Sequence, residues 1–247
     1  MRFSQTSTTH RPWPLPPGPW VMEQSWHDVL FAHWDVPAES LRALIPAGLA
    51  LDLFEGQAWL GVVPFRMTGV RPRFVPAMPW LSAFPELNVR TYVTAWGKPG
   101  VWFFSLDAGN PLAVAIARAW FHLPYYRAQM RIRDASGWIQ YASMRTHDGA
   151  APADFQGRYR PVGEPFFGVR GTLEHFLTER YCLYTSGAGH RLYRGEIHHA
   201  PWALQLAEAE IQVNTMAACL GIRLPAELPL LHFSRRQDVA VWRLQRL

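Results

Sequence analysis

Polar and apolar positions alternate most clearly in residues 86–93, which read ELNVRTYV. Successive strand side chains point to opposite faces, so Asn88 and Arg90 share a face with Glu86, and the apolar residues take the other. Tyr92 falls on the polar face. A solvated outer face produces the same alternation. We expect a strand whose polar face lines an enclosed pocket, where these side chains must find pairing partners.

Similar patterns, interrupted by turn residues, predict further strands along the chain. Residues 150–165 contain proline and glycine breaks and indicate a long connection. With three or four short helices, the elements predict a single α+β domain. Its centre is a strongly bent antiparallel sheet, partly closed into a barrel or cone. The expected strands are residues 26–36, 49–54, 57–65, 101–106, 128–132, 181–185, 190–197, 202–213, 230–233 and 239–244.

A capped helix is predicted after residue 110. Asn110 is a favourable N-cap, and Pro111 occupies the first turn, where its missing N–H has no consequence. Pro124 requires the helix to end near Phe121. The extended segment that follows contains Tyr125 and two further aromatic side chains, His122 and Tyr126. These side chains are candidates for a site, and core packing is the alternative interpretation.

Composition sets the outer limits. A chain of 247 residues with 49% apolar content can bury one sizeable core. Residues 1–20 are proline-rich and indicate an extended arm, so residues 21–247 are expected to form the domain. No apolar run is long enough to span a bilayer and no signal peptide is evident, so we expect a cytoplasmic protein without membrane contact. Cys182 and Cys219 are expected to stay reduced.

The net charge of +5 comes almost entirely from scattered arginines. No nucleic-acid-binding motif accompanies them, so nucleic acid is not an expected partner. The neighbouring histidines His198 and His199 point apart on an extended chain and have no second ligand cluster, so no metal is expected. The chain lacks dinucleotide, P-loop, hydrolase and zincin motifs, and no cofactor is expected.

Lys98 is the only lysine. It is predicted at a hairpin tip, residues 97–100, which would face water. An imine-forming lysine needs burial or a neighbouring cation to lower its pKa. Lys98 therefore does not suit Schiff-base chemistry.

The segment ARAWFHLPYYRAQM resembles the GRE…PKK segment of acetoacetate decarboxylases, where a helix ends at a proline and two lysines follow. Here Tyr125 and Tyr126 stand at the lysine positions, so the resemblance does not imply decarboxylation through an imine. It implies a cone around a central cavity. It also matches Glu86 to the glutamate of that family's site and puts His27 near its substrate-binding arginine.

A second resemblance covers the chain from about residue 21 to its end. The run ERYCLYT, residues 179–185, and the run LYRGEIHHAPW, residues 192–202, resemble the YqjF-like bacterial proteins, a family of unknown function. This resemblance implies no activity.

Two function classes stay open. The first is an enzyme acting on a small oxygenated or carboxylated molecule, in which Glu86 and a tyrosine exchange protons. The second is a small-molecule-binding protein without chemistry. Whether the chain forms a homo-oligomer is also left open. The candidate catalytic residues are Glu86, Tyr125 and Tyr126, and the candidate substrate-binding residues are His27, Asn88, Arg90, Tyr92 and His122.

Overall fold

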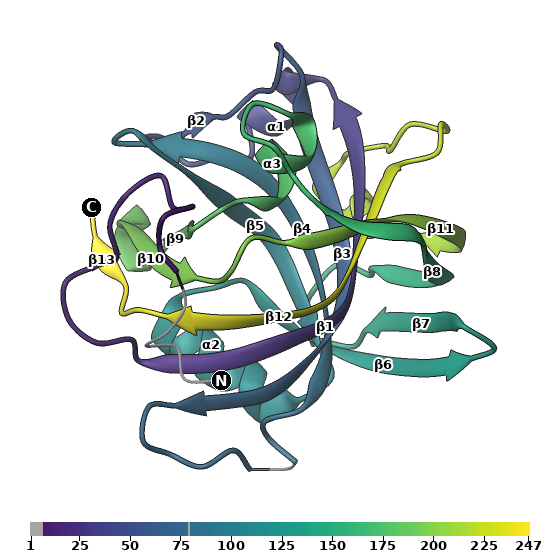
Figure 1. The fold of residues 1–247 in the computed structure, drawn as a ribbon, viewed down its shortest axis with the longest axis horizontal. Coiled ribbons are helices and arrows are strands. Elements are labelled where there is room, and N and C mark those ends of the chain that lie inside the picture. The colour runs from purple at the N-terminus through teal and green to yellow at the C-terminus, as the bar shows by residue number, and fades with distance from the viewer. Residues whose placement is uncertain (1–6, 79) are drawn as a thin grey trace.

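The structure is a computed structural model that describes residues 7–78 and 80–247. Strands dominate it, and the few helices are short (Figure 1). The strands are β1 (Met22–Val36), β2 (Ala50–Leu51), β3 (Ala58–Pro72), β4 (Phe84–Ala95), β5 (Lys98–Ala108), β6 (Tyr125–Ala135), β7 (Trp138–Arg145), β8 (Asp154–Phe167), β9 (Cys182–Ser186), β10 (Leu192–His198), β11 (Ala203–Asn214), β12 (Leu230–Val241) and β13 (Gln245–Arg246). The helices are α1 (Ala38–Arg42), α2 (Pro111–Phe121) and α3 (Leu173–Thr178), with short 3₁₀ turns η2 (Ala188–His190) and η3 (Ala218–Leu220).

The strands form one curved sheet that closes on itself. From β5 the order runs through β6, β7, β8, β11, β12, β1, β3 and β4, and β4 pairs back with β5. β9 and β10 form a second bridge from β5 to β12. The expected bent and partly closed sheet is confirmed, but it is mixed rather than antiparallel, because β5 pairs in parallel with both β6 and β9.

Five strands, β12, β1, β3, β4 and β5, form a wall shared by the two bridges. Both faces of β4 are buried, so the wall separates two interior regions.

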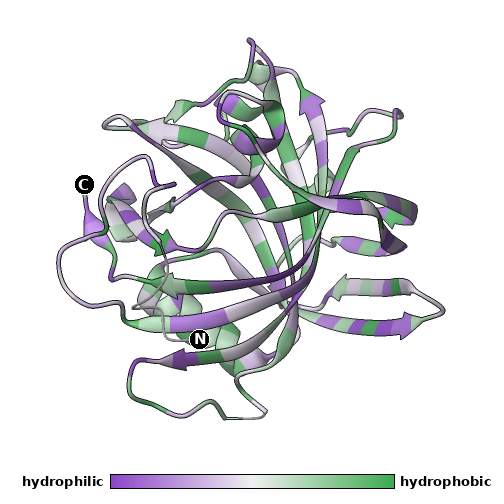
Figure 2. Ribbon diagram, in the orientation of Figure 1, coloured by the Kyte–Doolittle hydropathy of each residue, from purple (hydrophilic) through white to green (hydrophobic). Residues whose placement is uncertain are grey.

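The β6–β7 hairpin projects from the body of the molecule, and hydrophilic and hydrophobic residues alternate along its strands (Figures 1 and 2).

We call the first region the apolar core. It packs Leu87 and Val89 of β4 against residues of β7 and β8 such as Tyr141 and Phe155. We call the second region the polar-lined core. Its apolar members include Val29, Phe31, Val63, Phe65, Leu106, Tyr125 and Trp202.

Helix α2 and Tyr125 close one side of the polar-lined core. The α2 helix has the predicted bounds, and the Asn110 side chain accepts hydrogen bonds from the N–H groups of Leu112 and Ala113, each at 3.1 Å. His122 ends the helix with a φ of 50°, so the chain turns sharply before Pro124 and β6. This turn fixes which side of β6 each tyrosine occupies.

The arm also contacts the fold. Residues 7–20 contain no strand or helix and run beside β9, β10 and β13 (Figure 1). Arg11 donates to the carbonyl of Ile197 at 2.6 Å and lies 3.4 Å from a carboxylate oxygen of Glu196. Trp13 donates to the same carboxylate at 2.8 Å.

Three predictions about local structure were wrong. Residues 154–167, expected within a connection, form strand β8, and residues 230–241 form one continuous strand instead of two. Lys98 is not at a solvent-facing tip. Its strand begins there, after a turn at Trp96 and Gly97, and its Nζ lies 2.7 Å from the carboxylate of Glu196.

Candidate functional site

Glu86 and Tyr125 meet inside the polar-lined core. The Tyr125 hydroxyl donates a hydrogen bond to Oε2 of Glu86 at 2.8 Å, and both side chains are buried. This hydrogen bond joins the segment after helix α2 to the polar strand, and Tyr125 is the tyrosine that points inward. From the apolar side, Tyr141 donates to the backbone carbonyl of Glu86 at 2.7 Å, which fixes the strand at this point.

Burial changes the protonation of this pair. Burial raises the pKa of Glu86 to about 8, and the nearby Asp107 carboxylate adds to the rise, while the hydrogen bond from Tyr125 opposes it. The pKa of Tyr125 is raised well above its usual value by burial and by Glu86. At neutral pH the carboxyl is therefore a neutral acid and the phenol keeps its proton, so Tyr125 does not suit the role of a base.

Tyr126 lies on the opposite side of β6. The Arg145 guanidinium stacks over its ring at 4.2 Å, and the His147 ring packs against it edge-on at 5.4 Å. Arg145 also makes two 2.8 Å hydrogen bonds to Asp107, a buried pair that the sequence did not reveal. Tyr126 is thus not brought together with Glu86, as the alternation of side chains in a strand requires.

Asn88 and Arg90 are buried beside Glu86. The exposed fractions are 2% for Glu86, 4% for Asn88 and 9% for Arg90, which agrees with the expectation that they do not face bulk water. The expected pairing is incomplete. Asn88 Oδ1 and Arg90 Nε have no hydrogen-bond partner in the described part of the chain, and Nη2 of Arg90 donates to the Leu177 carbonyl at 3.4 Å.

Arg90 has no carboxylate partner among residues 7–78 and 80–247. Its guanidinium lies over the Phe31 ring, 5.2 Å from the centroid, which is an attractive but weak contact. The other buried arginine of this region, Arg180, pairs with Asp52 at 2.5 Å. A buried charge without a partner is costly, so Arg90 is suited to receive an anionic group from outside the chain.

A histidine that sequence reasoning missed lies in the same region as Arg90. His33 Nε2 lies 2.6 Å from the Tyr92 hydroxyl, which donates to the Leu177 carbonyl at 2.8 Å. Because this hydroxyl proton is used, we assign the Nε2–H tautomer to His33. Burial, with smaller effects of Arg90 and His232, holds the pKa of His33 well below its usual value. His33 lies two residues after Phe31 in the same strand, so the sequence alone places the two side chains on one face of that strand.

The polar-lined core has a concentration of unpaired polar atoms. Phe31 pairs in register with His232, Val29 pairs with Ser234, and Trp202 packs between Trp26 and Phe31. Each unpaired buried atom costs about 1–3 kcal/mol. The buried atoms here that lack a partner within the described residues are Trp26 Nε1, His33 Nδ1, Asn88 Oδ1, Arg90 Nε, Trp202 Nε1, His232 Nδ1 and Ser234 Oγ.

Two candidate residues lie elsewhere. The His27 ring contacts the Thr68 hydroxyl at 2.7 Å, and its strand neighbours are Arg66 and Arg236. Burial and these two arginines lower the pKa of His27. The His122 ring packs on Tyr193 at 5.2 Å. Among the described residues, no hydrogen bond, ion pair or ring contact joins either histidine to Glu86 or Arg90.

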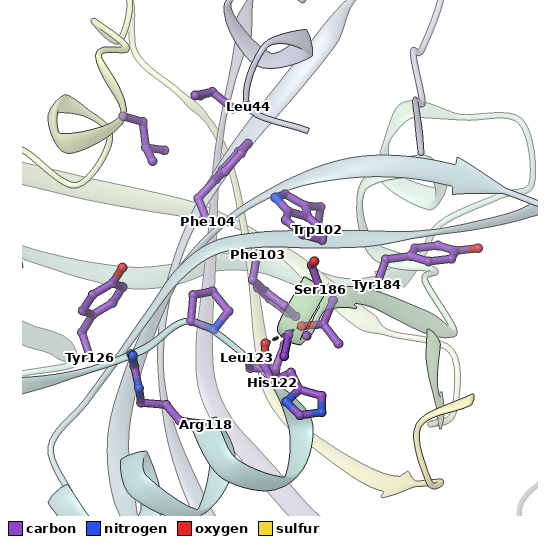
Figure 3. A pocket seen from close by; sticks show the side chains of 15 residues that line it. Leu44, Trp102, Phe103, Phe104, Arg118, His122, Leu123, Tyr126, Tyr184 and Ser186 are labelled. Atoms are coloured by element: carbon purple, nitrogen blue, oxygen red, sulfur yellow. Dashed lines mark hydrogen bonds between the residues drawn. The ribbon is translucent and has the colours of Figure 1, made fainter. Parts of the chain in front are cut away.

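An open cleft of about 540 Å³ lies outside the polar-lined core. Figure 3 shows Arg118 and Tyr126 at one end, and Phe103, Leu123 and His122 near the middle. Its lining does not include Glu86, Asn88 or Arg90. The remaining lining residues are Leu44, Trp102, Phe104, Pro124, Tyr184, Thr185, Ser186, Gly187, Ala188 and Leu220.

The described residues offer neither a metal cluster nor a membrane-spanning helix. Within the described ranges, no group of three or more His, Cys, Asp or Glu side chains is placed to hold a metal ion. No described helix has both the length and the apolar character to cross a bilayer.

Comparisons with known proteins give a family. Residues 23–238 match the family model DUF2071, described as an uncharacterized conserved protein. The chain is 50% identical over 245 residues to the uncharacterized protein YqjF of Bacillus subtilis (strain 168), covering 99% of this chain and 98% of that protein.

Solved structures show the same fold at low sequence identity. Acetoacetate decarboxylase from Legionella pneumophila is similar with a TM-score of 0.64 and 12% identity, over 97% of this chain and 93% of that one. The enduracididine biosynthesis enzyme MppR complexed with pyruvate is similar with a TM-score of 0.62 and 12% identity, over 97% and 94%. The acetoacetate decarboxylase-like fold is therefore established, and these likenesses alone assign no activity.

Proposed function

The chain belongs to the DUF2071 family, and we propose that this member binds a small carboxylate-bearing molecule against Arg90 in the polar-lined core. One observation carries the proposal: Arg90 is buried and has no carboxylate partner in the described part of the chain. A planar guanidinium can hold a carboxylate through two parallel hydrogen bonds. The complex between MppR and pyruvate, a small 2-oxo carboxylate, is consistent with such a ligand in this fold.

The surroundings favour a ligand with one negative charge. Glu86 is neutral at pH 7 because its pKa is about 8, and His33 is neutral because its pKa is lowered. Arg90 is then the main charge facing this region, and a single carboxylate balances it. Asn88 Oδ1 needs a donor, so an N–H or O–H group on the ligand also fits.

The pair of Glu86 and Tyr125 supports acid–base chemistry on the bound molecule. The phenol occupies Oε2 of Glu86, which leaves the acidic proton for the other oxygen. A carboxyl group with a pKa near 8 can give and take a proton near neutral pH. Lysine imine chemistry is not part of the proposal, because Tyr125 occupies the lysine position and Lys98 pairs with Glu196.

Titration calorimetry with acetate, pyruvate and benzoate tests the binding. We expect at least one of them to bind the wild-type protein and Arg90→Met to weaken that binding at least about tenfold, which is 1.4 kcal/mol. Arg131→Met is the matched control, because Arg131 is exposed on β6 and the same charge is lost. Absence of binding to the wild type, or equal losses in both variants, would contradict the proposal.

A second measurement separates an enzyme from a binding protein. In deuterated water, an enzyme that uses Glu86 should accelerate exchange of the pyruvate methyl protons, as followed by proton NMR. Glu86→Gln should abolish the acceleration and keep the binding, since the amide still accepts from Tyr125. Binding without accelerated exchange would favour the alternative function, a small-molecule-binding protein.

A further inference from the structure

The cleft lies where the sheet forks. On one edge, β5 pairs with β9 at Val101 and Trp102 and with β6 at residues 106–108. Residues 103–105 between these pairings have no strand partner on that edge within the described residues. The wall of the molecule is therefore not closed by backbone hydrogen bonds at this point, and side chains alone close it.

Two of these side chains touch the cleft and the polar-lined core. Leu123 is a buried member of that core, Phe103 packs against it, and both line the cleft. Phe103 is the direct strand partner of Arg90, next to an irregularity in the pairing of β4 with β5. Leu123 lies two residues before Tyr125. Through Phe103 and Leu123, the floor of the cleft is thus next to the strand position of Arg90 and to the segment that carries Tyr125.

We propose that this cleft is the entrance through which a small anion reaches the polar-lined core, passing between Phe103 and Leu123. The inference rests on the proposed function for the nature of the ligand. Rotation of two apolar side chains breaks no backbone hydrogen bond, whereas passage elsewhere through the wall would disrupt the strand ladder. The chain around Leu123 is the short turn between α2 and β6, where His122 already has a positive φ.

Arg118 attracts anions to this entrance. It lines the cleft from the last turn of α2, and its Nη1 donates to the Tyr125 carbonyl at 2.6 Å. Among the described residues it forms no ion pair, so its charge remains available at the mouth. A cation beside a cleft raises the local concentration of a small anion and its rate of arrival.

A cysteine placed inside the core can report passage without any ligand. Ser234→Cys puts a thiol on the interior side of β12, beside Val29, and Ser143→Cys makes the same change at a buried serine of β7 outside that core. Both are made with Cys219→Ala. The anionic reagent sulfonatoethyl methanethiosulfonate and its cationic trimethylammonium analogue then measure access, with mass spectrometry locating the adduct.

We expect Leu123→Ala to speed the modification of position 234 about tenfold, because it removes part of the closure. Ser186→Trp, which narrows the cleft, should slow it. The anionic reagent should outpace the cationic one, and Arg118→Gln should remove that preference. Position 143 should respond to none of these changes.

Unchanged rates of thiol modification at position 234, or parallel changes at position 143, would overturn the proposal that this cleft is the entrance. That result is distinct from failure of the proposed function, which is measured by carboxylate binding to the wild type and to Arg90→Met. Carboxylate binding that depends on Arg90, together with unchanged thiol rates, would reject the entrance alone.

Discussion

The two faces of strand β4 are both buried, and they differ in polarity and in how fully their groups are paired. Leu87 and Val89 face the apolar core, where hydrocarbon fills the space. Glu86, Asn88 and Arg90 face the polar-lined core, where an acid is kept neutral and an arginine lacks a carboxylate partner in the described residues. Burial alone does not determine what a face does. The faces differ in their contacts: the apolar side chains are packed against other apolar side chains, whereas the polar face retains buried polar atoms without hydrogen-bond partners in the described residues.

The largest expected effect comes from exchanging the character of the two faces. Val89→Asn places an amide in the apolar core without partners and should lower the free energy of unfolding by about 4 kcal/mol. Asn88→Leu removes an acceptor that is already unpaired, so its effect should stay within about 1 kcal/mol. Chemical denaturation at neutral pH measures both. Equal losses would mean that the polar face is as complete as the apolar one.

The dependence of stability on pH sharpens the comparison further. The pKa of Glu86 is about 8 in the folded protein and 4.5 in a free chain. Between these values the folded state holds the extra proton, so stability should fall as pH rises, by about 1.4 kcal/mol per pH unit. The fall should end above about pH 8, where both states are ionised.

Glu86→Gln should remove this component of the pH dependence. The measurement is the difference between wild type and variant in the free energy of unfolding across pH 5 to 8. A difference that stays constant with pH would show that Glu86 ionises normally.

A substitution at Gly61 tests how closely the side chains of His33 and Arg90 pack against the backbone of β3. A Cβ at this position would lie 3.0 Å from the His33 ring and 3.4 Å from Arg90 Cγ. Gly61→Ala should therefore cost about 2 kcal/mol through overpacking. Adding His33→Ala should recover part of that loss in a double-mutant cycle by denaturation. Additive losses would mean that the two residues do not compete for space.

The smallest effect separates the two tyrosines. Tyr125→Phe removes the hydrogen bond to Glu86 and should cost about 1 kcal/mol while weakening carboxylate binding. Tyr126→Phe should change both quantities less, because its hydroxyl makes no hydrogen bond to another described residue. Thermal unfolding and calorimetry report the two properties. Similar effects of the two variants on binding would count against Tyr125 as part of the site.

Local rules predicted the parts of the fold that local physics determines. The bounds of α2 follow from Asn110, Pro111 and Pro124, and the alternation in β6 separates Tyr125 from Tyr126. The same rules identified the polar face of β4 but could not by themselves show that it is buried, since a solvated outer face produces the same alternation. Strand β8 was missed because Gly157 and Pro161 suggest turns, while pairing with β11 holds them in a strand.

Contacts between residues far apart in the sequence could not be predicted from local patterns. The position of Lys98 depends on Glu196, which lies 98 residues away. The pair of Asp107 and Arg145 spans 38 residues, and neither residue stands out in its own segment. Such contacts depend on how the sheet closes, which local sequence patterns do not encode.

The shared wall also sets the order of events during synthesis. Its strand β1 pairs with β12, so Leu30 meets Phe233. A ribosome must synthesise all the residues between Leu30 and Phe233 before this pairing is available. Until then both cores lack one side, and a nascent chain stopped before β12 presents apolar strands to its neighbours, a condition that favours aggregation and recruits chaperones.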